Sequence, residues 1–235
     1  MLRAAFVRPS PRLQPVLAAL PLAVWTAFHL WEQWVAFSGR DAWLDRMRTT
    51  SQGPVAIGIE IVAVLAPLAV WAVLAVLDLV RGARDRAARD PAAGDAGTLG
   101  RALARLSPFA ALIAIVFVAI HAGHLWGPKV IRGASLAETW WALTHDLGHP
   151  AMLVLYALGL SAIALHLAVA IPEALAAVGW VSTAPARRQA TLVASVFAIC
   201  AWILAVQLTG WVATGHGSFW SIDVIERAAP SPTGP

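Results

Sequence analysis

The stretch HPAMLVLYALGLSAIALHLAVAIPEALAAV, residues 149–178, decides the fold of this chain. Its only charged residue is Glu173, close to its end, and nearly all of the rest is apolar. A membrane core about 30 Å thick is crossed by a helix of roughly 20 apolar residues, so the stretch is long enough to span a bilayer. We therefore predict a transmembrane helix here, and it carries His166 well inside the apolar sequence.

Four further segments share this length and composition. They are residues 14–36, 54–79, 107–128 and 189–214. The chain of 235 residues is 59% hydrophobic and 13% charged, with a mean hydropathy of +0.70. A soluble domain of ordinary composition carries about 25% charged residues. The sequence thus predicts an all-α membrane protein, in which five transmembrane helices form one bundle and one domain over residues 1–235.

The basic residues predict the direction of the spans. Eleven of them lie in the N-terminal segment, in the polar loop 81–105 and in the loop before residue 189, and six lie on the other side of the membrane. Because basic residues favour the cytoplasmic side, we expect the N-terminus and the loop 81–105 in the cytoplasm, and the C-terminal tail, residues 216–235, outside. The net charge of +4 then reflects topology rather than a nucleic-acid-binding surface. We predict a multi-pass protein of a bacterial inner (cytoplasmic) membrane.

Three histidines lie deep within the predicted spans: His29, His124 and His166. A titratable side chain inside a membrane is costly and indicates function, and imidazole is a usual axial ligand of haem iron. His29 lies about 15 residues, and His124 about 17 residues, after the start of its span, so at about 1.5 Å per residue both lie in the outer half at one depth. We predict that these two imidazoles bind one haem iron; the alternative for each is a hydrogen bond between helices or a place in the lining of a cavity.

The inner half lacks such a pair. His166 lies there on the fourth span, and the residue at the same depth on the second span is Trp71. An indole nitrogen only donates hydrogen bonds, so Trp71 is not a ligand. We therefore expect one haem in this chain and favour the absence of a second, proximal haem at His166; the alternative is a second haem held by His166 alone or with an unexpected partner.

Several stretches of the chain resemble a known family. They are FHLWEQWVAFSG, GIEIVAVLAPLAVW, FVAIHAGHLW and the fourth span with GWVSTAPARRQ after it. In order and spacing, over about residues 14–210, they are similar to the five-helix, single-chain cytochrome b anchor of succinate dehydrogenase and fumarate reductase. The resemblance implies a distal haem b bound by His29 and His124. It also maps the ligands of a proximal haem to His166 and to Trp71, where the chain departs from the family.

The resemblance also implies partners. In this family a flavoprotein subunit interconverts succinate and fumarate, and an iron–sulfur subunit carries the electrons. By resemblance, this chain would anchor both subunits at the cytoplasmic face and exchange electrons with a quinone in the membrane, for which we expect menaquinone. The chain has no motif for dicarboxylate chemistry of its own, and its single cysteine, Cys200, is too few for an iron–sulfur cluster.

Three polar residues near the predicted haem are candidates for the quinone site. Glu60 lies in the outer part of the second span, and Glu32 and Gln33 follow His29 by about one turn. A carboxylate at that depth could exchange protons with a quinone; the alternative is an ordinary hydrogen bond or the polarity of a helix end. His121, one turn before His124, is expected to pack, with a spare ligand or a haem contact as its alternative.

The predicted function is that of a redox anchor, a haem b protein that passes electrons between an iron–sulfur subunit and quinone. Two alternatives remain open. The first is a cytochrome b subunit of another dehydrogenase or of a hydrogenase. The second is a non-redox membrane transporter or assembly factor, which the haem content of the purified chain would separate from the other two.

Overall fold

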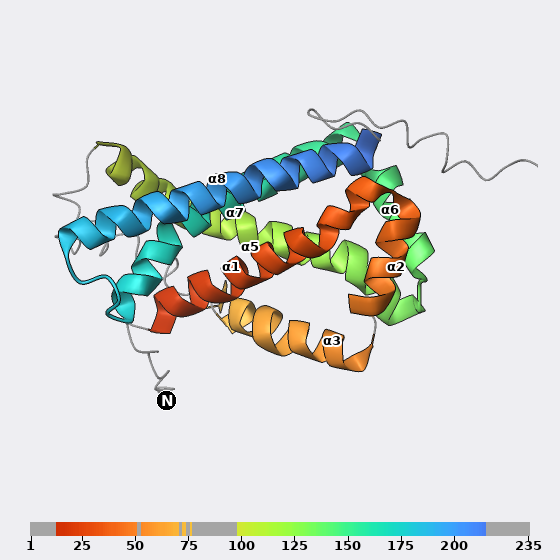
Figure 1. Cartoon of the computed structure of the whole chain (residues 1–235), viewed down its shortest axis with the longest axis horizontal. Helices are drawn as coiled ribbons and strands as arrows, with labels where there is room; N and C mark the ends of the chain where they lie inside the picture. The colour runs from red at the N-terminus through yellow and green to blue at the C-terminus, as the bar shows by residue number, and fades with distance from the viewer. Residues whose placement is uncertain (1–12, 51–52, 71, 74–75, 77–97, 215–235) are drawn as a thin grey trace, which may run out of the picture.

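The computed structural model describes residues 13–50, 53–70, 72–73, 76 and 98–214, and within these ranges all regular structure is helical. Four long helices run beside one another (Figure 1): they are α1 (Leu13–Gln33), α5 (Thr98–Arg132), α7 (Pro150–Ala177) and α8 (Ala184–Thr214). Each contains, or continues into, a stretch that is long and apolar enough to cross a membrane. The prediction of a helical, multi-pass membrane protein is confirmed at this level, whereas the orientation of the spans stays a prediction.

The second predicted span is described only in part. It begins with α3 (Pro54–Glu60), continues through the π-helical turn η2 (Ile61–Leu65) and remains helical to residue 70. Trp71 and residues 74–75, 77–97 and 215–235 lie outside the described residues. Residues 98–105, expected in the cytoplasmic loop, form the first turns of α5. Four spans are therefore found among the described residues, and the fifth stays a prediction.

Helix α7 is central to the described bundle. It is apolar on all sides, as expected of a helix with neighbours or lipid all round it, and α1, α5 and α8 all pack against it. The core where they meet includes Leu22, Phe117, Ile163, Leu167 and Ala198. Small residues on facing surfaces let the helix backbones approach closely, as is usual in membrane bundles.

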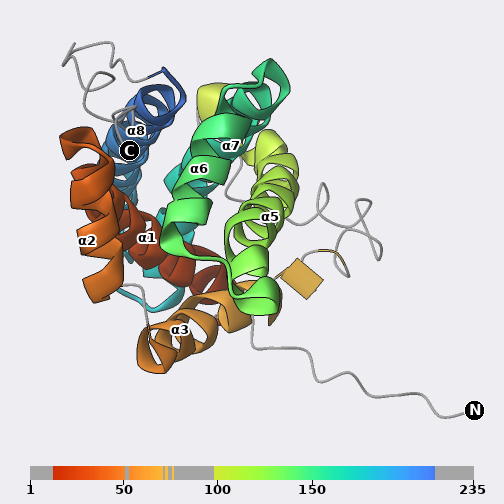
Figure 2. The ribbon, with the colours of Figure 1, turned by 90° about the vertical axis from the view of Figure 1, so that its right-hand side faces the viewer.

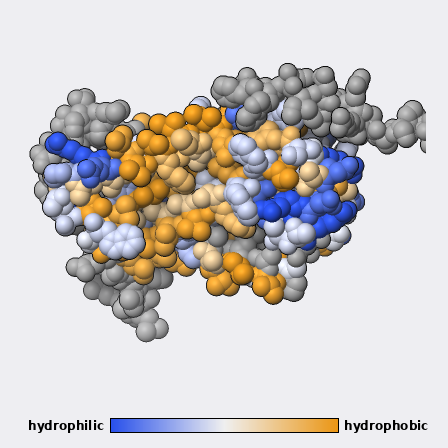
Figure 3. Space-filling model, in the orientation of Figure 1, coloured by the Kyte–Doolittle hydropathy of each residue, from blue (hydrophilic) through white to orange (hydrophobic). Residues whose placement is uncertain are grey.

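The outward surfaces of these helices are apolar as well. Val154 and Leu158 of α7, and Leu192 and Val193 of α8, are each more than half exposed. Figure 3 shows apolar residues over the middle of the molecule and polar ones toward its two ends. Such a band matches the hydrocarbon core of a membrane, with polar residues at the two faces.

Two short helices cover the end of the bundle at which α1 ends and α7 begins. They are α2 (Arg40–Thr50), which follows the 3-10 turn η1 (Trp34–Ser38), and α6 (Leu136–Leu147). Figure 2 looks at this end and shows both helices in front of the long ones. We call it the capped end. The indole Nε1 of Trp43 donates to Oε1 of Gln33 at 2.7 Å and ties α2 to α1.

Helix α6 lies where the sequence analysis expected only a loop between spans. It forms because its first turn has a complete capping box. The Ser135 hydroxyl accepts from the backbone N–H of Glu138 at 3.2 Å, and the Glu138 carboxylate accepts from the backbone N–H of Ser135 at 2.6 Å. Two of the backbone donors that a helix start leaves without partners are satisfied in this way.

Candidate functional site

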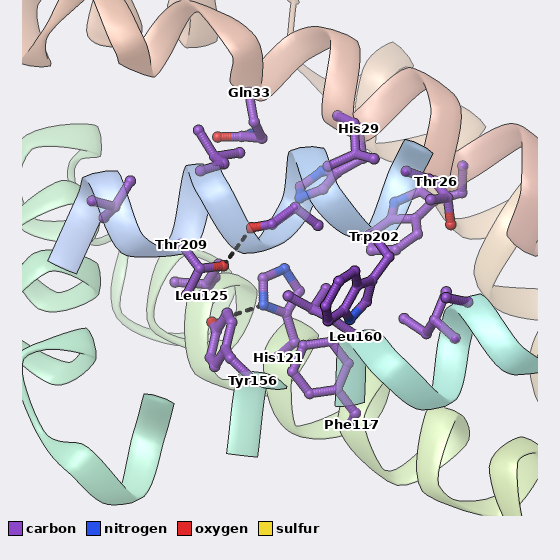
Figure 4. A pocket seen from close by; sticks show the side chains of 18 of the residues that line it. Thr26, His29, Gln33, Phe117, His121, Leu125, Tyr156, Leu160, Trp202 and Thr209 are labelled. Atoms are coloured by element: carbon purple, nitrogen blue, oxygen red, sulfur yellow. Dashed lines mark hydrogen bonds between the residues drawn. The ribbon is translucent and has the colours of Figure 1, made fainter. Parts of the chain in front are cut away.

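A cavity of about 120 Å³ lies inside the bundle next to the capped end (Figure 4). Its walls come from α1, α5, α7 and α8, and most of its lining side chains are apolar. Trp43 of α2, with Leu143 and Leu147 of α6, lines it from the capped end. The fold thus builds an apolar chamber beside His29, where the sequence predicts a haem.

Two imidazoles reach this cavity from different helices: His29 from α1 and His121 from α5. Their ring centroids are 5.7 Å apart, and their planes are nearly perpendicular at 86°. The indole of Trp25, one turn before His29, stacks on the His29 ring with centroids 4.6 Å apart and planes 14° apart. The structure therefore brings together His29 and His121, whereas the sequence analysis paired His29 with His124.

Aromatic neighbours fix the ring of His121. Its Nδ1 lies 2.9 Å from the hydroxyl oxygen of Tyr156 on α7. The ring also stacks on Phe117, with centroids 5.7 Å apart and planes 25° apart. Figure 4 shows the Tyr156 hydroxyl on one side of the His121 ring and His29 on the other. Nε2 is therefore the nitrogen of His121 that is directed toward His29.

His124 lies one turn further along α5 and is not among the described residues that line the cavity. Its Nε2 lies 2.6 Å from Oδ2 of Asp146 on α6, and the two side chains are 27% and 31% exposed. Its Nδ1 is buried and has no hydrogen-bond partner within the described part of the chain. The imidazole thus links α5 to α6, and its role as a haem ligand stays a prediction.

His166 lies in the other half of the bundle, away from the capped end. The residue is 4% exposed, and its Nε2 donates to the backbone oxygen of Ala18 on α1 at 3.3 Å. The imidazole therefore connects α7 to α1, which is the alternative that we considered for any membrane histidine. Trp71, its expected counterpart on the second span, lies outside the described residues.

The three quinone candidates fall in different places. Glu32 is buried, 5% exposed, near the end of α1. Gln33 lines the cavity, where its amide oxygen accepts the hydrogen bond of the Trp43 indole. Glu60 is the last residue of α3, and its side chain lies outside the part of the chain that is described. Of the three, the structure brings Gln33 to the cavity.

The imidazoles of His29 and His121 fit the donor set of a haem. Two imidazoles that bind one metal ion from opposite sides, each at about 2 Å, have ring centroids roughly 6 Å apart, close to the 5.7 Å observed. Among the described residues no group of three or more His, Cys, Asp or Glu side chains is arranged to hold a metal ion. An ion held by side chains alone is thus not indicated there, whereas haem iron needs only axial ligands from the protein.

The size of the cavity sets a condition on this fit. Its volume of about 120 Å³ is smaller than the roughly 300–1,000 Å³ of sites that hold larger organic ligands. A porphyrin is larger than the cavity as it stands, so its binding would require lining side chains such as Leu125 to turn aside.

Sequence reasoning missed the residues that surround the two imidazoles. Tyr156 is the only tyrosine of the chain and stands in an apolar span; the available signal was that a buried phenol needs a hydrogen-bond partner. Trp43 has the sequence context of a tryptophan at the membrane interface, but it is buried, 5% exposed, over the cavity.

Comparison of the chain with protein-family models, with curated protein sequences and with solved structures finds no match. The resemblance to succinate dehydrogenase anchors is accordingly carried by the quoted stretches alone. A functional assignment has to rest on the residues of the cavity and on their geometry.

Proposed function

We propose that this chain is the haem b-binding membrane anchor of a succinate:quinone oxidoreductase, and that it passes electrons between an iron–sulfur subunit and membrane quinone. One observation supports the proposal above the others. His29 and an imidazole of α5 meet in an apolar cavity inside a bundle of helices that can span a membrane. Two facing imidazoles from separate helices are what a bis-histidine haem in a helical bundle requires.

A bound haem would supply a centre that takes up and gives off one electron at a time. The chain's own residues hold, orient and insulate that centre. His29 and an α5 imidazole would hold it through their ring nitrogens, and Trp25 restricts the rotation of the His29 ring by stacking on it. The apolar lining excludes water, so a change of charge inside the cavity is stabilised by the fixed groups around it rather than by solvent.

Reduction of a quinone needs two protons as well as two electrons, so polar groups must reach its carbonyl oxygens. Gln33 and Thr26 both line the cavity. The hydroxyl oxygen of Thr26 is buried and has no hydrogen-bond partner within the described residues, so it is free to donate to a polar atom that enters the cavity beside the haem. Glu32 and Glu60 remain the candidates for proton exchange, and the dehydrogenase subunits, which the resemblance implies, would dock at the cytoplasmic face.

The first test measures haem in the full-length chain purified in detergent. We expect a low-spin b-type spectrum on reduction with dithionite and one haem per chain. His29→Ala should abolish this signal, because it removes an axial ligand from the cavity. The matched control is His145→Ala, since the His145 ring stacks on Trp141 with centroids 5.0 Å apart and is not among the described cavity residues.

Two results would contradict the proposal. A chain without haem would exclude the redox function and favour the transporter or assembly alternative. Two low-spin haems per chain would refute the expectation of a single haem. In native membranes, reduction of the haem by succinate supports the dehydrogenase partner, whereas reduction by formate or hydrogen but not by succinate identifies a different dehydrogenase or a hydrogenase.

A further inference from the structure

We infer that His121, positioned by the hydroxyl of Tyr156, is the α5 ligand of this haem, and that His124 serves instead to tie α5 to α6. The inference rests on the proposed function, because it takes a haem between α1 and α5 as given. It departs from the resemblance, which maps the α5 ligand to His124, and it gives Tyr156 a role as a positioning residue.

Placement supports His121 first. Both His29 and His121 line the cavity, with ring centroids 5.7 Å apart, whereas His124 is not among its described lining residues. A separation of roughly 6 Å is expected of two imidazoles bound to one metal ion at about 2 Å each. The ring separation therefore suits two imidazoles that share one metal ion, and a porphyrin between them would also require lining side chains to move aside.

One of the two nitrogens of His121, Nδ1, already has a partner. A metal takes the lone pair of one ring nitrogen, and the other nitrogen then carries the proton and commonly donates it to a fixed acceptor. At His121 the hydroxyl oxygen of Tyr156, 2.9 Å from Nδ1, is that acceptor. Nε2, on the side of the ring toward His29, is left for iron.

Tyr156 is itself held in place. The residue is 5% exposed, and its ring packs edge-on against Phe117 with centroids 5.2 Å apart and planes at 84°. A partner with so little freedom fixes the orientation of the His121 ring before a metal arrives, and the tautomer with its proton on Nδ1 is the one that leaves Nε2 for iron. Outer partners of this kind raise the basicity of a ligating imidazole.

His124 is arranged for a different task. The 2.6 Å between its Nε2 and Oδ2 of Asp146 is short, as in a charge-assisted hydrogen bond. The contact joins a long helix to one of the two short helices of the capped end. For His124 to become the ligand, its ring would have to leave Asp146 or bind through Nδ1, and it would have to enter a cavity that it does not line.

The deciding experiment compares His121→Gln with His124→Gln in the full-length chain, with haem stoichiometry and the low-spin absorption spectrum as readouts. Glutamine keeps a hydrogen-bonding side chain of similar length, and it does not replace a histidine as axial ligand. We expect loss of the low-spin haem in His121→Gln and its retention in His124→Gln. Loss in His124→Gln with retention in His121→Gln overturns the inference and leaves the proposed function standing. If the unaltered chain contains no haem, both the inference and the proposed function are refuted.

A second variant tests the positioning role, and it decides the matter if the glutamine variants do not fold. Tyr156→Phe keeps the aromatic ring against Phe117 and removes only the hydroxyl. We expect haem to be retained, with its midpoint potential shifted to more positive values, because a His121 whose N–H has lost its acceptor stabilises ferric iron less well. An unchanged potential overturns the inference.

The matched control is Ser161→Ala. The Ser161 hydroxyl of α7 accepts a hydrogen bond of 3.0 Å from the indole Nε1 of Trp202, which also lines the cavity. Like Tyr156→Phe, this change removes a hydroxyl of α7 that is hydrogen-bonded to a residue of the cavity wall. In this case the bonded residue is Trp202, so no imidazole loses a partner. The potential of the haem should therefore stay as in the unaltered chain, and a shift equal to that of Tyr156→Phe overturns the specific role of Tyr156.

Discussion

The half of the bundle next to the capped end and the half around His166 both bury imidazoles, but they use them differently. His29 and His121 face one another in a cavity, whereas His166 donates to the backbone oxygen of Ala18. A histidine inside a membrane span is therefore not a ligand by its depth alone. An imidazole bonded to a helix carbonyl is a contact between helices, whereas the haem site proposed above rests on two imidazoles that meet in a cavity.

Side-chain size explains the difference. In the half around His166, α1 presents Ala18 and Ala19, which are 6% and 2% exposed. Small residues let two helix backbones approach closely, so an imidazole of α7 can reach a carbonyl of α1. At the cavity, α1 instead presents the stacked rings of Trp25 and His29. Bulky rings take the place of small side chains there, and the cavity lies beside them.

Among the variants that test the difference between the two halves, Gly159→Ala on α7 is expected to have the largest effect. A methyl group at this position would overlap the ring of Phe117, which lines the cavity and stacks on His121. Either the ring moves toward His121 or the helices separate, and overpacking of a core costs about 1–3 kcal/mol. We expect lower thermal stability in detergent, measured by circular dichroism, and a several-fold loss of haem.

Gly210→Ala on α8 is the matched control. A methyl group there meets nothing within 4 Å, and alanine favours a helix over glycine by about 1 kcal/mol. This variant should be as stable as the unaltered chain or slightly more stable. If Gly159→Ala behaved in the same way, Phe117 would be free to move, and the cavity half would not be the tightly fitted site described above.

A smaller effect, confined to the other half, is expected from His166→Ala. The change removes a buried imidazole and its bond to the Ala18 carbonyl, which should lower the free energy of unfolding by about 1–2 kcal/mol. Haem should remain at one per chain, because His166 is not among the described residues of the cavity. Haem stoichiometry and thermal unfolding of one preparation measure both quantities. A haem loss as large as that of His29→Ala would mean that both halves bind haem.

The long helices were predictable, and the short ones were not. The predicted spans 14–36, 149–178 and 189–214 agree with α1, α7 and α8 to within a few residues, apart from an earlier start of α8. A run of about 20 apolar residues leaves the backbone few alternatives to a membrane helix. Helices α2 and α6 depend instead on the bundle end that they cover, and only the spacing of Ser135 and Glu138 signalled one of them.

The site was predictable in outline only. Depth along the spans brings His29 to the level of a histidine on α5, but His121 and His124 differ by just one turn and by about 60° around the helix. Their neighbours separate them, since Tyr156 contacts one and Asp146 the other. Both partners come from helices that are distant in sequence, so the choice between the two histidines needed tertiary structure.

The smallest effect is expected at the first turn of α6, which covers only the cavity half. Hydrogen bonds from the backbone and the side chain of Ser135 hold the pKa of Glu138 below its usual range. A carboxyl group of this kind stabilises the fold above its unfolded pKa of about 4.3, and the contribution is lost as the pH falls through the lower folded value.

In Glu138→Gln we expect faster hydrogen exchange of the α6 amides than in the unaltered chain near neutral pH, and no difference in acid. Amides of α7 around His166 should exchange alike in both chains. A difference that persists in acid would show that the Glu138 charge does not stabilise α6, and a change around His166 would show that the cap supports both halves.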